Sequence, residues 1–130
     1  GKMDIQKSRQ PTLSVSEVHL ISCIGEAKDE GCTVTSLARA LSITVSSATI
    51  AVNKLGQRGY VRKVRSSKDG RIVRVHLTEA GQSVYTYHRI CRREMVDEIS
   101  RDFSPEEKKV ALKVLNRLNE YFVKNVGNGF

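Results

Sequence analysis

Tryptophan is absent from this 130-residue sequence, and aromatic residues make up only 5% of it, so the core must be mostly aliphatic. Cysteine is scarce too. Cys23, Cys32 and Cys91 form an odd, widely spaced set, which argues against a disulfide framework and is typical of a reducing cytoplasm. No run of about 18 apolar residues occurs, and the N-terminus lacks the apolar stretch of a signal peptide. We therefore expect a cytoplasmic protein without a membrane partner, folded as a single domain over residues 1–130.

Motifs of an active site are missing as well. The sequence has no glycine-rich phosphate loop, no nucleophile elbow and no recognisable arrangement of paired carboxylates. His19 and Cys23 stand four residues apart on a predicted helix, a spacing that can bind a metal, but no carboxylate shares their face. We expect core packing there, and we expect no enzyme activity, no cofactor and no metal.

Positive charge is concentrated in the middle of the chain. Residues 36–93 hold 12 Lys/Arg and 2 Asp/Glu, whereas residues 1–35 and 94–130 each carry a net charge of −1. The whole +8 excess of the protein therefore comes from the central segment. Clustered cations bind polyanions because they release counterions from phosphates, so double-stranded DNA is the expected partner.

Capping signals predict the scaffold helices. Ser14 and Glu17 form a capping box at the start of a first helix, which Gly31 is expected to end. Thr78 is expected to cap a long helix over about 79–102, and a second capping box at Ser104 begins the last helix. Residues 1–12 are interpreted as a polar arm or the end of a clipped helix, and residues 127–129 as a frayed end.

Residues 33–78 predict a helix-turn-helix followed by a β-hairpin. Thr33 caps a short helix, a turn follows at 42–43, and Thr44 caps a third helix that ends near Gly59. Strands are expected at 60–65 and 71–77, because both segments are β-branched and alternating and flank an Asp-Gly turn signal within 66–70.

The third helix has one face suited to reading bases. A helical wheel places Val45, Ala48, Val52 and Leu55 toward the preceding helix and centres the opposite face on Ile50. An exposed Ile50 can contact a thymine methyl, while Asn53 and Gln57 can pair with adenine edges. The alternative is that Ile50 packs on another element and that the face is ordinary polar surface. With the basic hairpin, the residues expected to contact DNA are Ser46, Ser47, Thr49, Ile50, Asn53, Lys54, Gln57, Arg65, Lys68, Asp69 and Arg71.

The sequence resembles the MarR family of winged helix-turn-helix transcription regulators. The resemblance runs from about residue 13 to 122 and rests on the order and spacing of several short motifs. They are Leu37-Ala38, Ile43-Thr44, Leu55, Arg58-Gly59-Tyr60-Val61, Asp69-Gly70-Arg71, Leu77-Thr78-Glu79-Ala80-Gly81 and Ser104-Pro105-Glu106-Glu107. It implies a mainly α fold with a small β-hairpin wing and long dimerisation helices.

The resemblance also implies a function and a division of the chain. Residues 33–78 would bind DNA, and residues 13–31 and 79–124 would form the scaffold and the dimer. A homodimer would bind a palindromic operator, usually as a repressor, with half-sites about one helical turn apart. Asp69 would orient Arg71 toward the minor groove, and a small-molecule effector would bind between the dimer helices and the DNA-binding lobe.

Two departures from the family pattern accompany this resemblance. The usual long first helix before residue 13 is largely missing, which suggests a truncated chain. Gly56 stands where relatives usually carry an acidic residue, and it should loosen the third helix. Within the family, the segments at 43–44, 53–55 and 58–60 look most like repressors of fatty-acid biosynthesis genes, which would make an acyl-carrier protein with its acyl chain the effector.

Other interpretations stay open at this stage. His19, Tyr85 and His88 are candidate residues of an effector pocket, although a packed or partly exposed helix face is the favoured explanation. The fold could be a protein-interaction module that does not read DNA, a hypothesis that only the apolar Ile50 favours. It could also be a redox-sensing regulator, which would require a cysteine such as Cys32 with a depressed thiol pKa.

Overall fold

The computed structural model describes residues 12–126, and the expectations for residues 1–11 and 127–129 lie outside this range. Six helices and one two-stranded antiparallel sheet follow one another along the described chain. Their order is α1 (Val15–Glu26), the short 3-10 helix η2 (Lys28–Glu30), α2 (Val34–Leu41), α3 (Val45–Gln57), β1 (Val61–Arg65), β2 (Val73–Leu77), α4 (Glu79–Ile99) and α5 (Pro105–Val126). This is the predicted winged helix-turn-helix with two long helices.

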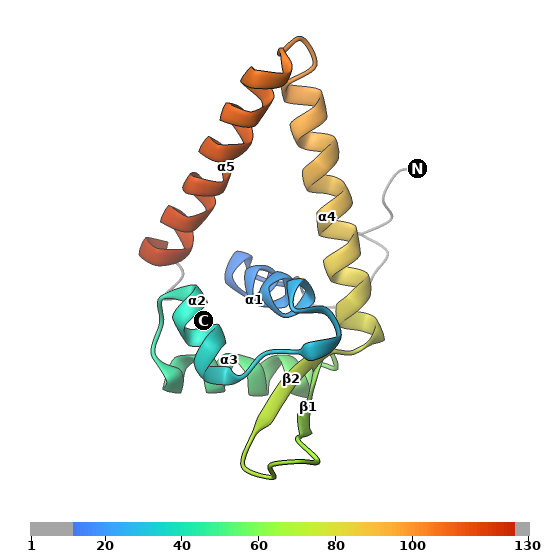
Figure 1. Cartoon of the computed structure of the whole chain (residues 1–130), viewed down its shortest axis with the longest axis vertical. Coiled ribbons are helices and arrows are strands. Elements are labelled where there is room, and N and C mark those ends of the chain that lie inside the picture. Colours follow the sequence, from blue (N-terminus) through green and yellow to red (C-terminus); the bar gives the residue numbers. More distant parts are fainter. Residues whose placement is uncertain (1–11, 127–130) are drawn as a thin grey trace.

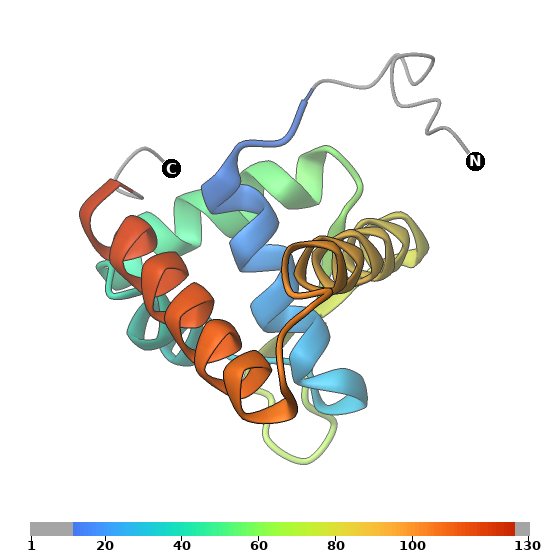
Figure 2. The ribbon, with the colours of Figure 1, turned by 90° about the horizontal axis from the view of Figure 1, so that it is seen from above.

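The helices are arranged as a compact head below a wide arch. Figure 1 shows α4 and α5 as the two legs of the arch, with α1 between them, α2 and α3 at the base, and the hairpin extending beyond the base. Seen from above, α1 again lies between α4 and α5 (Figure 2). No single helix in residues 12–126 is long and apolar enough to cross a membrane, and α2 with α3 meets that test only as a pair bent by 110°.

The head has one aliphatic core centred on α1. Burying large apolar side chains from α1, α2, α3 and the hairpin stabilises the fold by roughly 1.5–3 kcal/mol for each one. The largest fully buried hydrophobic side chains are Leu20, Ile21, Ile24, Leu37, Leu41, Val52, Leu55 and Val75. The prediction of an aliphatic core is therefore confirmed.

Helix starts follow the predicted caps. The hydroxyl oxygen of Ser14 accepts from the amide of Glu17, and the Glu17 carboxylate accepts from the amide of Ser14. The hydroxyls of Thr33, Thr44 and Thr78 each accept an amide of the first turn that follows. Each cap satisfies a backbone donor that the helix itself leaves open, so short-range sequence decides where these helices begin.

The predicted end of the first helix is wrong. α1 stops at Glu26, because Lys28 adopts a left-handed backbone with φ 55° and η2 follows. Gly31, at φ 69°, closes η2 instead. A Cβ at Gly31 would lie 2.7 Å from the carbonyl oxygen of Val75, so glycine allows the chain to approach β2 and form a bridge between Cys32 and Val75. The sequence analysis did not predict this bridge.

The wing is shorter than predicted. β1 begins at Val61 and β2 at Val73, two residues later than expected for the second strand. The amide of Ile72 donates to the carbonyl of Asp69 at 2.9 Å, which places Gly70 and Arg71 at the centre of a tight turn. Arg71 therefore belongs to the wing tip and not to a strand.

Two further predictions need correction. Val45 does not face α2, since it lies in the first turn of α3 and is 48% exposed. The long helix ends at Ile99 and not near 102. Met95, Ile99 and the following Phe103 are exposed on the arch.

Candidate nucleic-acid interface

The outer face of α3 presents a row of exposed side chains at the base of the molecule. Ala48, Val52 and Leu55 are buried against the head, as predicted. The opposite face is exposed, and Ile50 at its centre leaves 54% of its surface in water. Ser46, Asn53, Lys54 and Gln57 are exposed beside it, while Thr49 is half-buried. The alternative in which Ile50 packs on another part of residues 12–126 is therefore excluded.

The N-terminal turn of α3 is held by its cap. The Thr44 hydroxyl oxygen accepts from the amide of Ser47 at 3.0 Å, and the Thr44 hydroxyl also donates to the Ser47 hydroxyl at 3.0 Å. Ser47 is thus engaged within the turn, whereas Ser46 lies exposed next to it. Of the two serines, Ser46 is the one better placed to contact a phosphate.

Hydrogen bonds within the wing tip fix its shape. The Ser66 hydroxyl oxygen accepts from the amides of Lys68 and Asp69, both at 3.2 Å. The Asp69 carboxylate accepts from the amide of Arg71 at 3.0 Å and from its Nε at 3.4 Å. Arg65 donates to the carbonyl of Gly70. Asp69 therefore holds Arg71, as the resemblance implied, while Arg65 is partly occupied within the wing.

The backbone around Tyr60 connects α3, the wing and α4. The amide of Tyr60 donates to the carbonyl of Leu55 in α3, and the Tyr60 carbonyl accepts from the amide of Thr78 at the start of α4. The Thr78 hydroxyl also donates to the carbonyl of Gly59. A Cβ on Gly81 would lie 2.1 Å from the Tyr60 carbonyl oxygen, so the two backbones touch here. These contacts set the position of the wing relative to α3.

The three candidate effector residues line one cleft. His19, Tyr85 and His88 border a cavity of about 660 Å³ between the start of α1, the middle of α4 and α5. Leu13, Val18 and Met95 supply apolar walls. His19, Tyr85 and His88 therefore lie around one cavity, and their role as an effector site stays a prediction.

Burial decides the charge states in this cleft. It lowers the pKa of His88, and burial together with the Arg92 charge lowers the pKa of His19, so both imidazoles are held neutral. The Tyr85 hydroxyl donates to the Glu26 carboxylate at 2.7 Å, and burial with this bond raises the pKa of Tyr85. The lining is largely apolar, with Glu26, Arg89 and Arg92 as its charged members, and apolar walls favour an apolar ligand body.

Cys23 and Cys32 do not have the depressed thiol pKa of a redox sensor. Burial raises the pKa of the Cys32 thiol, and burial with the nearby Cys32 and Glu26 raises the pKa of Cys23 to about 11. A sensor cysteine needs a depressed pKa to form the thiolate. The redox hypothesis for Cys32 is therefore disfavoured. Within residues 12–126, no group of three His, Cys, Asp or Glu side chains could hold a metal ion.

The sequence analysis missed two features near these sites. One is an ion pair between Glu17 and Arg58, and the other is a polar cavity beside the base of the wing. Both join residues far apart in the chain, so no local spacing signals them. The one signal in the sequence was the scarcity of Asp and Glu among the cations of residues 36–93, which indicates that these cations have few acidic partners nearby in the chain.

Comparisons with known proteins agree with this geometry. The model of the MarR family matches residues 13–73. The crystal structure of Streptococcus pneumoniae FabT in complex with DNA is 32% identical, with a TM-score of 0.73 over 92% of this chain and 82% of FabT.

Two curated relatives are regulators of Bacillus subtilis. The HTH-type transcriptional regulators YhjH and YwhA are 27% and 28% identical over 68% and 67% of this chain. The match spans 49% of YhjH and 63% of YwhA, so the chain covers about half to two-thirds of the length of these relatives.

Proposed function

The chain belongs to the MarR family of transcriptional regulators, and from this premise we propose that it is a repressor that binds a palindromic operator as a homodimer. Its relatives are regulators and not enzymes. The observation that carries the proposal is the exposed Ile50 face of α3, which lies at the same end of the molecule as the basic wing (Figure 1). We further propose that residues 33–78 act as the reading head, with 13–31 and 79–124 as the scaffold, in the cytoplasm.

The α3 face and the wing would contact different parts of the DNA. We propose that Asn53 and Gln57 read base edges in the major groove, with Ile50 against a thymine methyl. Arg71, held by Asp69, would enter the minor groove. Backbone contacts would come from the remaining polar and basic residues of the set, which are Ser46, Ser47, Thr49, Lys54, Arg65 and Lys68.

The arch supports the proposal of a homodimer. Apolar side chains along α5 are exposed in the single chain, and an exposed apolar face of this length is typical of an interface. They include Val110, Val114, Leu118, Tyr121 and Phe122. Replacing Leu118 by Glu should convert the dimer to monomer in sedimentation velocity, whereas Lys113→Glu on the same helix should not. A monomeric unmodified chain would refute the dimer.

The cleft around His19, Tyr85 and His88 is our proposed effector site. Its apolar walls fit a hydrocarbon chain, and the segments at 43–44, 53–55 and 58–60 resemble those of repressors of fatty-acid biosynthesis genes. A small molecule or an acyl-carrier protein bearing an acyl chain would therefore be the effector. The test compares operator binding with acylated carrier and with unloaded carrier, and equal binding in both would reject the acyl-chain effector.

Selection from random duplex DNA tests the main proposal. The full chain is incubated with a random pool at two salt concentrations, and the bound sequences are read. We expect enrichment of a palindrome with half-sites about one helical turn apart. Salt-sensitive binding without enrichment would reduce the protein to a nonspecific basic domain, and no binding would favour the protein-interaction module.

A further inference from the structure

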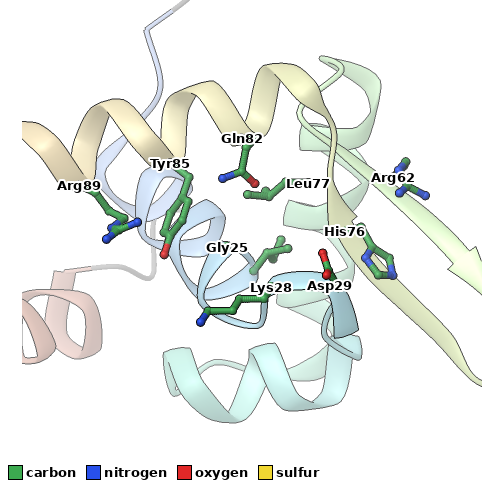
Figure 3. A pocket seen from close by; sticks show the side chains of 10 residues that line it. Gly25, Lys28, Asp29, Arg62, His76, Leu77, Gln82, Tyr85 and Arg89 are labelled. Carbon is green, nitrogen blue, oxygen red and sulfur yellow. The ribbon is translucent and has the colours of Figure 1, made fainter.

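A second cavity shares Tyr85 and Arg89 with the effector cleft. It has a volume of about 590 Å³ and is formed by the C-terminal end of α1, η2, the base of the hairpin and the first turns of α4 (Figure 3). This is within the range of pockets that hold small organic molecules. Its polar lining consists of Lys28, Asp29, Arg62, His76, Gln82 and Arg89.

Positive charge dominates this cavity. Lys28, Arg62 and Arg89 bring three permanent cations from three different elements, and Asp29 is the only carboxylate in the lining. No salt bridge within residues 12–126 engages any of the three cations. Cations that line one hollow give it a positive potential, which favours binding of an anion.

The site is held in place by packing beneath it. The ring of Tyr85 lies against the backbone of Gly25, where a Cβ would come within 2.6 Å of the ring carbons. The guanidinium carbon of Arg89 lies 5.6 Å from the centre of the same ring. Figure 3 shows Tyr85 and Arg89 on successive turns of α4, with Gln82 one turn away on the same side. Gly25 therefore leaves room for the Tyr85 ring, and Arg89 packs against that ring.

Hydrogen-bond donors come from opposite walls. Arg62 and His76 are cross-strand partners in the hairpin, so their side chains lie on the same face of it. Gln82 and Arg89 come from α4, and Lys28 follows α1. Ile24 and Leu77 supply the apolar part of the lining. Charged donors around a small apolar surface fit a compact organic molecule that carries anionic groups.

We infer that this pocket, which we call the anion pocket (Lys28, Arg62, His76, Gln82 and Arg89), binds a compact organic anion bearing carboxylate or phosphate groups. The pocket has no lining residue from the exposed face of α3 or from the wing tip, and it has only Tyr85 and Arg89 in common with the effector cleft. It joins α1, the hairpin base and α4, so a bound anion links the wing to the long helix. The inference does not depend on operator binding or on the effector of the cleft.

Titration calorimetry of the full chain with citrate and with pyrophosphate tests this inference. The two probes separate carboxylate from phosphate chemistry, and both titrations are made at one fixed ionic strength. We expect saturable binding of at least one probe at one site per chain. In parallel, the NMR signals of the Gln82 side-chain amide should shift on addition of that probe.

Charge-neutralising variants locate the site. Arg62→Gln and Lys28→Gln should each weaken binding about tenfold, the loss expected when one charged hydrogen bond is removed. Arg39→Gln removes the same charge from an exposed position on α2 that lines neither cavity, and it should change binding by less than about twofold. Arg89→Gln repeats the test from α4.

Three results would overturn the anion pocket. They are no saturable binding of either probe, an equal loss of binding in Arg39→Gln, and a loss that appears in Lys68→Gln at the wing tip instead of in Arg62→Gln. Circular dichroism of each variant confirms that it is folded before titration. Because the Lys28 side chain forms no hydrogen bond or salt bridge within residues 12–126, its variant keeps the test valid if Arg89→Gln disturbs Tyr85.

Discussion

The guanidinium of Arg58, at the C-terminal end of α3, lies 3.3 Å from both carboxylate oxygens of Glu17 in the first turn of α1. The two residues are 41 positions apart in the chain. Glu17 also completes the capping box of α1, and Arg58 lies over the ring of Tyr60. One carboxylate therefore connects the recognition helix to the helix that borders the effector cleft.

This ion pair should contribute measurably to stability. The side chains of Arg58 and Glu17 are only 26% and 18% exposed, so solvent screens them less than a surface pair. A double-mutant cycle with Glu17→Gln and Arg58→Met should give a coupling energy of about 1 kcal/mol in urea unfolding. The exposed Glu98–Arg101 pair is the control and should show weaker coupling. Equal coupling in the two cycles would contradict the prediction.

Base reading and phosphate contact can be separated by two substitutions. Asn53→Ala should weaken binding to one operator selectively, by about 1–3 kcal/mol, because a paired contact to a base is lost. Lys68→Ala should weaken binding to all duplexes similarly and reduce the salt slope by about 1. Fluorescence anisotropy with the selected operator, a mutated operator and an unrelated duplex measures both. Identical behaviour of the variants across the three duplexes would reject base reading by Asn53.

Two glycines should respond oppositely to alanine. Gly81→Ala forces a methyl group into the Tyr60 carbonyl at the start of α4, and it should destabilise the fold by about 2 kcal/mol or more. Gly56 lies within α3, and a Cβ added there would be 3.8 Å from its nearest neighbour, Val61. Gly56→Ala should therefore stabilise the fold by up to about 1 kcal/mol. Thermal and urea unfolding of the two variants give the comparison. Similar effects of the two substitutions would show that the Gly81 contact is not rigid.

Stability should fall in mild acid because of His19. Burial and Arg92 lower the pKa of His19 in the folded chain below 6.5, so the unfolded chain binds a proton more readily. The Asn119 amide nitrogen donates to Nδ1 of His19 at 3.3 Å, and protonating Nδ1 removes that acceptor. The part of the free energy of unfolding that depends on neutral His19 is therefore fully present above about pH 6.5, and it decreases as the pH drops below that value.

The substitution His19→Gln tests this pH dependence. It keeps a hydrogen-bond acceptor for Asn119 and removes the titrating group, so the decrease between about pH 7 and 5 should become smaller. His88, whose pKa burial also lowers, should account for part of what is left. Urea unfolding at a series of pH values gives the slopes, and an unchanged slope in His19→Gln would rule out this role for His19.

Local signals in the sequence were sufficient for most of the fold. The capping residues Ser14, Thr33, Thr44 and Thr78 predicted four helix starts, because each acts on an amide three residues away. Hydrophobic spacing also identified the buried side of α3. The exposed face of that helix followed directly, since a side chain on one face of a helix cannot lie on the other.

Long-range contacts were beyond the same reasoning. The break after α1 depends on the approach of Gly31 to Val75, and the position of Glu17 depends on Arg58. Neither partner can be found from spacing. Periodicity also could not show that Ile99 would be exposed on the arch and not buried in the head.

Arg71 is 94% exposed, yet its amide and its Nε are both held by Asp69. A long side chain usually loses up to about 2 kcal/mol of rotational freedom when it is immobilised at an interface. In this wing, the contact between the Arg71 Nε and Asp69 restricts part of that rotational freedom before any DNA is bound. The wing tip should therefore meet a narrow groove as a preshaped probe, with a smaller entropic penalty on association than a free arginine would incur.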